Sequence, residues 1–128
     1  LRISPNYPEA HHNLGNALTL RGRLEEAIAH YIEALRIKPA YAEAHRNLGV
    51  ALDRQRQHKK AMHHYAEAIR IRPDDAQSHN NLGVALAEQG RLNEAIAHFT
   101  EALRINPSFA DARRNLQHGL KLMGKSGK

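Results

Sequence analysis

The sequence predicts an all-α protein, an α-solenoid built from antiparallel helix pairs that stack side by side. Prolines recur every 34 residues, at Pro5, Pro39, Pro73 and Pro107. Asn-Leu pairs recur with the same period, and between these markers the apolar residues follow helical spacing. A fixed period of this length is typical of stacked helical repeats, in which each pair of helices completes the core of its neighbour.

The period predicts three full repeats, at 8–41, 42–75 and 76–109. Residues 1–7 (LRISPNY) match 35–41 (LRIKPAY), so we expect them to be the tail of a preceding repeat whose beginning is missing. Residues 110–123 read as a single capping helix, and 124–128 as a basic tail. The whole chain, 1–128, is then one array.

Each repeat is predicted to contain two helices. The first, for example 42–55, places four residues on one arc at helical spacing, namely His45, Leu48, Gly49 and Leu52. The second, for example 93–105, stacks Ala95, Phe99 and Ala102 in the same way. Each recurring proline follows a second helix, which it could not continue.

The turn between the two helices requires a residue that accepts a left-handed backbone. Gly22 and Gly90 stand at this point in repeats 1 and 3, but repeat 2 has Arg56. A non-glycine residue pays about 1 kcal/mol for that conformation. We therefore expect the turn around Arg56 to be the weakest of the three.

Composition excludes several classes of protein. The chain has 19 Lys and Arg against 13 Asp and Glu, a formal charge of +6, together with 10 His and no Cys. A disulfide scaffold and a thiol nucleophile are therefore ruled out. The sequence contains neither a signal-peptide pattern nor an apolar run long enough to span a membrane, which favours a cytoplasmic location.

The repeat resembles the tetratricopeptide repeat. The pattern H-x2-L-G-x2-L, followed by a small residue, an aromatic and a proline, is carried in repeat 1 by His11, Leu14, Gly15, Leu18, Ala27, Tyr31 and Pro39. Repeats 2 and 3 match it at the same spacing, with His where the family prefers Trp and Leu where it often has Tyr. The resemblance implies a right-handed superhelix, a concave groove lined by the first helices, and a protein-interaction role without chemistry.

The asparagine column is the main candidate site. Asn13, Asn47, Asn81 and Asn115 lie opposite the core-facing arc, on the side expected to face the groove. Each amide can both donate to and accept from a peptide bond, as in the similar asparagine ladder of O-linked N-acetylglucosamine transferases. We expect Asn47 and Asn81 to hold an extended peptide and Arg46 and Arg114 to select acidic side chains. Alternatively, the asparagines bond neighbouring helices and fix the superhelix pitch.

Chaperone-binding members of the family carry a carboxylate clamp of Lys, Arg and Asn. The corresponding positions here are His12, Asn16, Asn47, Asn80 and Val84, or one repeat later Arg46, Val50, Asn81, Arg114 and His118. The first set keeps amides, including Asn16 and Asn80 as candidate groove residues, but has lost every strong cation. A clamp of this type is therefore disfavoured.

Two histidine columns also repeat, at His11, His45 and His79 and at His30, His64 and His98. No two histidines are four apart on a helix and cysteine is absent, so we expect neither a metal nor another cofactor. The first column lies on the core-facing arc. Burial should lower the pKa of these rings and make the fold acid-sensitive.

Nucleic acid is not expected to be the main partner. Arg36, Arg70 and Arg104 each follow a Glu by three residues and read as helix-surface ion pairs, and the groove lacks aromatic stacking platforms. No catalytic constellation is present.

The sequence thus predicts a non-catalytic scaffold that binds an extended, somewhat acidic peptide or protein segment in its groove. Two alternatives stay open. The array could self-associate end to end through an uncapped N-terminal face near Leu14, Leu18 and Leu20, or it could be the regulatory tail of a larger enzyme such as a glycosyltransferase.

Overall fold

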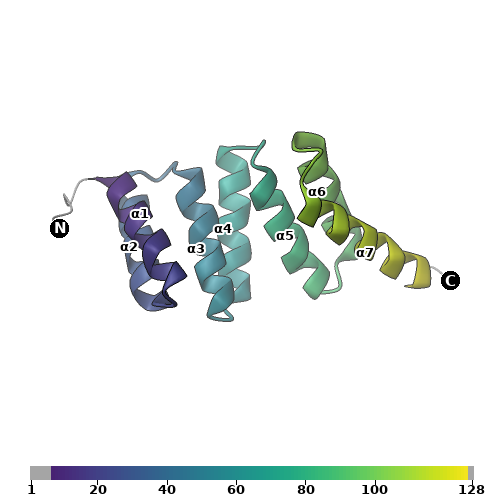
Figure 1. Cartoon of the computed structure of the whole chain (residues 1–128), viewed down its shortest axis with the longest axis horizontal. Coiled ribbons are helices and arrows are strands. Elements are labelled where there is room, and N and C mark those ends of the chain that lie inside the picture. Colours follow the sequence, from purple (N-terminus) through teal and green to yellow (C-terminus); the bar gives the residue numbers. More distant parts are fainter. Residues whose placement is uncertain (1–6, 127–128) are drawn as a thin grey trace. The chain divides into compact units, whose positions relative to one another are not determined.

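In the computed structural model, residues 7–126 are described, and they form seven α-helices and no strand. The helices are α1 (Pro8–Leu20), α2 (Leu24–Ile37), α3 (Ala42–Arg54), α4 (His58–Ile71), α5 (Ala76–Glu88), α6 (Leu92–Ile105) and α7 (Ala110–Ser126) (Figure 1). The predicted all-α helical-repeat fold is confirmed, with two helices in each repeat. None of these seven helices is long and apolar enough to cross a membrane.

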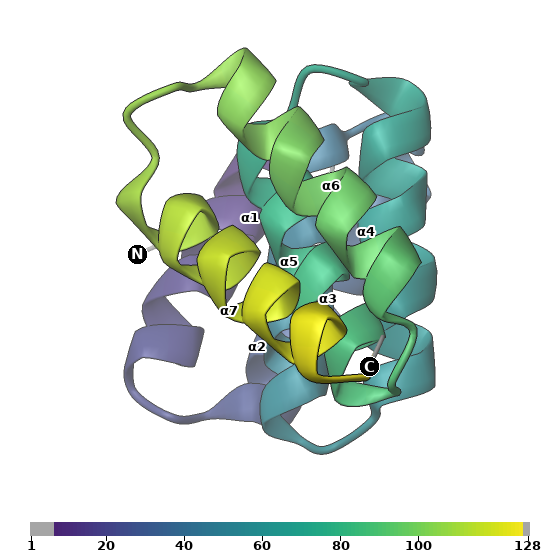
Figure 2. The same cartoon turned by 90° about the vertical axis from the view of Figure 1, so that its right-hand side faces the viewer.

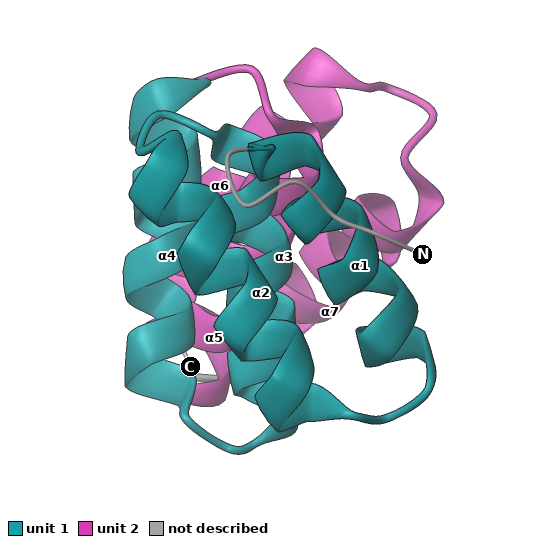
Figure 3. Ribbon diagram, turned by 90° about the vertical axis from the view of Figure 1, so that its left-hand side faces the viewer, with its two compact units in different colours: residues 1–72 teal, residues 73–128 magenta. Residues whose placement is uncertain are grey.

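The chain divides into two compact units, Leu1–Arg72 and Pro73–Lys128 (Figure 3). In unit 1, α1 packs against α2, α2 against α3, and α3 against α4. In unit 2, α5 packs against α6, while α7 contacts both α6 and α5 (Figure 2). Unit 1 therefore contains two helix pairs, and unit 2 contains one helix pair and α7.

A glycine on the first helix and an aromatic ring on the second hold each pair together. A Cβ added to the glycine would come within 2.5–2.6 Å of the ring in all three pairs, which are Gly15–Tyr31, Gly49–Tyr65 and Gly83–Phe99. The rings are at most 2% exposed. Alanines with no exposed surface, at Ala27, Ala61 and Ala95, allow the same helices to approach closely.

The turns within the three pairs share one geometry. Gly22 and Gly90 have φ of 77° and 78°, and Arg56 has φ of 63°, so repeat 2 keeps the left-handed turn without a glycine. In every repeat the residue after this position donates a 2.9 Å backbone hydrogen bond to the first helix, as Gln57 does to Leu52. The expected strain at Arg56 is therefore present.

The last helix is longer than expected. We predicted a capping helix at 110–123 with a tail from 124, but α7 continues to Ser126, while residues 127–128 lie outside the described part. Gly124 lowers helix propensity by about 1 kcal/mol but keeps its backbone hydrogen-bonding groups, so it does not stop the helix. Gln117 and Leu120 are exposed, as expected for a solvated outer face.

Replacing Arg56 by glycine should stabilise the fold. The substitution Arg56→Gly removes left-handed strain at an exposed position, so we expect the free energy of unfolding to rise by about 1 kcal/mol and the melting temperature by a few degrees. Thermal denaturation followed by circular dichroism measures this. Arg56→Ala is the matched control, because it removes the side chain but retains the strain, and should gain little. Equal melting temperatures for the two variants would contradict the explanation.

Candidate functional site

The first helices α1 and α3 of unit 1 border a pocket of about 280 Å³. We call it the unit-1 pocket, and it is lined by Asn16, Thr19, Leu20, Tyr31, Asn47 and Val50. The Tyr31 hydroxyl donates a 2.5 Å hydrogen bond to Asn16 Oδ1, and Asn47 Nδ2 donates to the same oxygen at 3.1 Å. Thr19 donates to the carbonyl of Gly15 at 2.8 Å. Asn16 and Asn47, which we expected in the groove, therefore meet at the floor of the unit-1 pocket.

His12 fixes the other side of Asn47. Its Nε2 lies 2.8 Å from Asn47 Nδ2 and its Nδ1 lies 3.0 Å from the Tyr41 hydroxyl. An amide nitrogen only donates, so Nε2 carries the lone pair and the ring proton sits on Nδ1. Burial lowers the pKa of His12, with Glu43 opposing the shift and Arg46 adding to it. The neutral ring that Asn47 requires is thus the favoured form.

The hydrogen bonds of Asn16 and Asn47 leave one amide donor and one amide acceptor available to a ligand. Both contacts of Asn47 use its nitrogen, and both contacts of Asn16 use its oxygen. Among the described residues, the oxygen of Asn47 and the nitrogen of Asn16 make no hydrogen bond. A peptide bond offers one N–H and one C=O, so this pair of free amide groups is its complement.

The remaining predicted residues are spread over both units. In unit 2, Asn115 Nδ2 donates to Asn80 Oδ1 at 3.0 Å, which repeats the contact between Asn47 and His12 two repeats earlier. Asn81 is half-buried on α5 and Asn13 is exposed on α1. Arg114 is exposed and paired with Asp111 on its own helix. Arg46 is half-buried on α3.

Unit 2 has a second pocket, of about 240 Å³, between α5 and α7. We call it the unit-2 pocket, and it is lined by Val84, Ala87, Glu88, Leu92, Phe99, Asn115, His118, Gly119 and Leu122. Of the positions named from the sequence as candidate groove or clamp positions, Asn115, Val84 and His118 line it. No sequence motif had singled out its apolar residues as a site.

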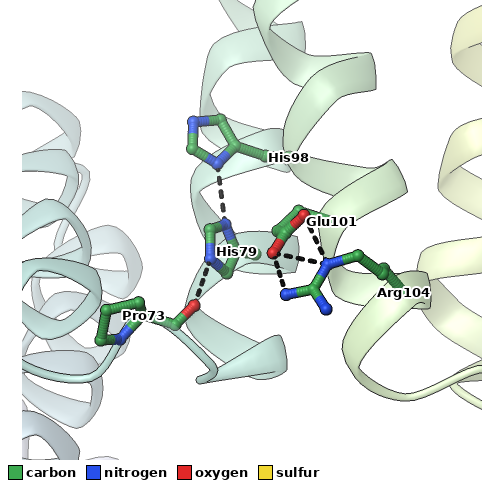
Figure 4. A network of polar contacts seen from close by, with 5 residues as sticks. All are labelled: Pro73, His79, His98, Glu101 and Arg104. Atoms are coloured by element: carbon green, nitrogen blue, oxygen red, sulfur yellow. Dashed lines mark hydrogen bonds and ion pairs between the residues drawn. The ribbon is translucent and has the colours of Figure 1, made fainter.

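The two histidine columns face each other, which the sequence reasoning missed. In every pair the Nδ1 atoms lie 3.0 Å apart, in His11–His30, His45–His64 and His79–His98 (Figure 4). The signal was available, since both columns have the period of the repeat and a constant offset of 19 residues.

Backbone carbonyls set the tautomers of these pairs. His79 Nε2 donates to the Pro73 carbonyl at 2.9 Å, and His45 Nε2 to that of Pro39 at 3.2 Å. Their Nδ1 atoms are therefore acceptors, and the partner rings His98 and His64 donate. The equivalent carbonyl in repeat 1 belongs to Pro5, outside the described residues.

The lowered pKa expected in the first column is confirmed for His45, where burial is the main cause. Burial also lowers the pKa of His98. It lowers that of His64 to about 4, with the neighbouring His45 and His63 adding to the shift. Within residues 7–126, no group of three or more His, Asp or Glu is placed to hold a metal ion.

The expected Glu–Arg surface pairs are also present. Glu33–Arg36, Glu67–Arg70 and Glu101–Arg104 form ion pairs with N–O distances of 2.5–3.0 Å (Figure 4). Each of these arginines pairs with a glutamate of its own helix. Ion pairs this exposed contribute little to stability.

Comparisons with known proteins agree with the repeat pattern. Family models described as "TPR repeat" and "Tetratricopeptide repeat" match residues 15–55 and 54–90 and residues 76–109, respectively. No curated protein sequence matches the chain.

Solved structures show the same fold. The first TPR of Spaghetti (RPAP3) bound to the HSP90 peptide SRMEEVD has a TM-score of 0.89 and 18% identity, over 97% of this chain and 98% of that one. The Arabidopsis OM64 TPR domain has a TM-score of 0.86 and 24% identity, over 89% and 94%. The Sgt2 TPR domain from Aspergillus fumigatus has a TM-score of 0.88 and 21% identity, over 94% and 81%.

Acid should destabilise the fold through the histidine pairs. The pKa of His64 lies near 4 in the folded chain and near 6.5 in the unfolded one, so its contribution is complete above pH 6.5 and is lost as the pH falls toward 4. We expect protonation of this ring to lower the free energy of unfolding by about 1–3 kcal/mol over that pH range. Chemical denaturation at pH 7, 5.5 and 4 measures the loss.

The variant His64→Gln keeps a donor for His45 but cannot be protonated, and should lose less stability in acid than the wild type. His118→Gln, which changes an exposed ring on α7, should behave like the wild type. An unchanged acid response in His64→Gln would show that this pair does not sense pH.

Proposed function

Because the chain belongs to the tetratricopeptide-repeat family, we propose that it is a non-catalytic interaction scaffold that binds an extended peptide along its first helices. Domains of this family generally act as interaction modules. The similar RPAP3 domain was solved with a bound peptide, which supports a peptide as the class of ligand.

The observation that carries the proposal is the asparagine pair in the unit-1 pocket. Tyr31 and His12 hold Asn16 and Asn47 in fixed orientations, so that one free amide donor and one free amide acceptor stand at the pocket floor. Groups fixed in this way lose little conformational entropy when a ligand binds. Backbone pairing of this kind tolerates many ligand sequences, which suits a scaffold.

Charge favours an acidic partner. The chain has a formal charge of +6, which raises the association rate with acidic segments. We propose that Arg46 in unit 1 and Arg114 in unit 2 interact with ligand carboxylates, as arginine does in charge-assisted hydrogen bonds. Asn81 and Asn115 would extend backbone pairing in unit 2.

Self-association is a second candidate function, favoured by exposed apolar side chains in unit 1. Leu20 is 85% exposed and Ile32 55% exposed, although Leu18, which we expected on the same face, is buried. Multi-angle light scattering over a range of concentrations tests this. Leu20→Arg, which copies the residue at the equivalent position, Arg54, should abolish any increase in mass.

Removing the Asn47 amide should weaken peptide binding. We expect Asn47→Ala to reduce affinity about 2–12-fold, since a net hydrogen bond contributes about 0.5–1.5 kcal/mol. The ligand is an acidic peptide selected from a random display library against the wild-type chain, and calorimetry gives the affinity. Circular dichroism checks that the fold is intact.

Asn13→Ala is the comparison variant, because it removes an exposed asparagine of the same column outside the unit-1 pocket lining, and it should reduce affinity less than Asn47→Ala does. If Asn47→Ala folds and binds like the wild type, the asparagines are structural and the proposed site is wrong.

A further inference from the structure

The unit-2 pocket occupies the same place in its repeat as the unit-1 pocket but has the opposite chemistry. Six positions correspond two repeats apart, pairing Asn16, Thr19, Leu20, Tyr31, Asn47 and Val50 with Val84, Ala87, Glu88, Phe99, Asn115 and His118. Of the four polar residues in unit 1, three are apolar in unit 2 and the fourth stays an asparagine, Asn115. The two apolar residues Leu20 and Val50 are replaced by the polar Glu88 and His118.

The unit-2 pocket lacks both hydroxyls and one of the two amides that the unit-1 pocket has. Phe99 packs on Gly83 as Tyr31 packs on Gly15 but carries no hydroxyl, and Val84 replaces the amide that Tyr31 bonds. Leu92 and Leu122 add further apolar surface. A polar group placed here would give up hydrogen bonds to water and find none in return, whereas an aliphatic one gains by leaving water.

The size of the pocket indicates a side chain rather than a whole small molecule. Its volume is about 240 Å³, below the roughly 300–1,000 Å³ of pockets that enclose small ligands. Asn115 stands beside the apolar floor, with its nitrogen held by Asn80, so its oxygen is placed to accept from a backbone N–H.

The helix that borders the pocket is basic on the adjoining face. Arg114, His118 and Lys121 follow one another at i, i+4 and i+7 along α7 and are all exposed, and His118 itself lines the pocket. Arg114 shares its charge with Asp111. On the α5 side, Glu88 adds one carboxylate to the pocket lining. A ligand that fills the pocket would therefore run beside positive charge on its α7 side, where the basic residues outnumber this single carboxylate.

We propose that the unit-2 pocket receives an aliphatic side chain from an acidic peptide segment. The proposal rests on the peptide-binding function above and adds a specificity to it. The aliphatic residue fills the space over Phe99 and Val84, and acidic residues on either side of it meet the basic face of α7. The unit-1 pocket, with its amide floor, does not make this selection.

Two designed peptides test the proposal. They are acetylated and amidated heptapeptides, Glu-Glu-Ser-Leu-Ser-Glu-Glu and the same sequence with Asn in place of Leu. Each peptide is titrated into the ¹⁵N-labelled chain of residues 1–128, and binding is followed at the backbone amides of Gly119 and Leu122. We expect the Leu peptide to bind about tenfold more tightly or better, as the burial of one aliphatic side chain predicts.

The double variant Val84→Asn/Phe99→Tyr gives the unit-2 pocket the floor of the unit-1 pocket. Both new residues already occur at the equivalent positions Asn16 and Tyr31, where they bond each other, so the fold has a precedent for them. The preference for Leu over Asn should disappear. Thr100→Ala, which changes an exposed residue of α6, should keep it.

A second variant does not alter the floor. Lys121→Glu should weaken both peptides several-fold and leave the ratio of their affinities unchanged, because it changes charge alone. Equal affinities of the wild type for the two peptides, shifts confined to unit 1, or no binding of either peptide would each overturn the proposal. The proposed function is tested separately, by the affinity of Asn47→Ala for the library-selected peptide, so it could hold in each of those cases.

Discussion

The contact between a glycine on each first helix and an aromatic ring on each second helix determines the rest of this structure. A methyl group in place of the hydrogen at Gly15, Gly49 or Gly83 would lie within 2.6 Å of ring carbon, so the helices could approach this closely only with glycine. The rings are almost fully buried and fill the space that small alanines leave between the helices. The spacing within each of the pairs α1–α2, α3–α4 and α5–α6 follows from this contact.

The same rings connect the core with the two pockets proposed to bind peptide. Tyr31 and Phe99 pack identically on their glycines, yet each also lines a pocket beside the first helices. A change between Tyr and Phe alters the pocket by one hydroxyl and leaves the packing as it is. Repeats can therefore diverge in what they bind while they keep one fold. The histidine pairs join the same helices by a second contact.

Most of the fold could be predicted from the sequence because the same residue types recur every 34 residues. Recurring Pro, Gly and Ala gave the helix pairs and the turns, including the left-handed Arg56. The exact end of α7 could not be predicted, since Gly124 weakens a helix without ending it. The site was predicted only in part. The position of Asn47 opposite the core-facing arc follows from helical spacing. Its partners His12 and Asn16 belong to another helix, and their contact with Asn47 depends on how α1 and α3 pack. The pairing of His45 with His64 was missed for the same reason.

The central claim is that ligands bind on the first helices rather than on the second ones. Backbone-amide NMR of the chain, titrated with a peptide selected from a random library, tests it most directly. The account predicts chemical-shift changes that cluster on α1, α3, α5 and α7, at residues such as Asn16, Val50 and Gly119. Changes confined to the second helices α2, α4 and α6, for example at Ile32 and Thr100, would contradict it.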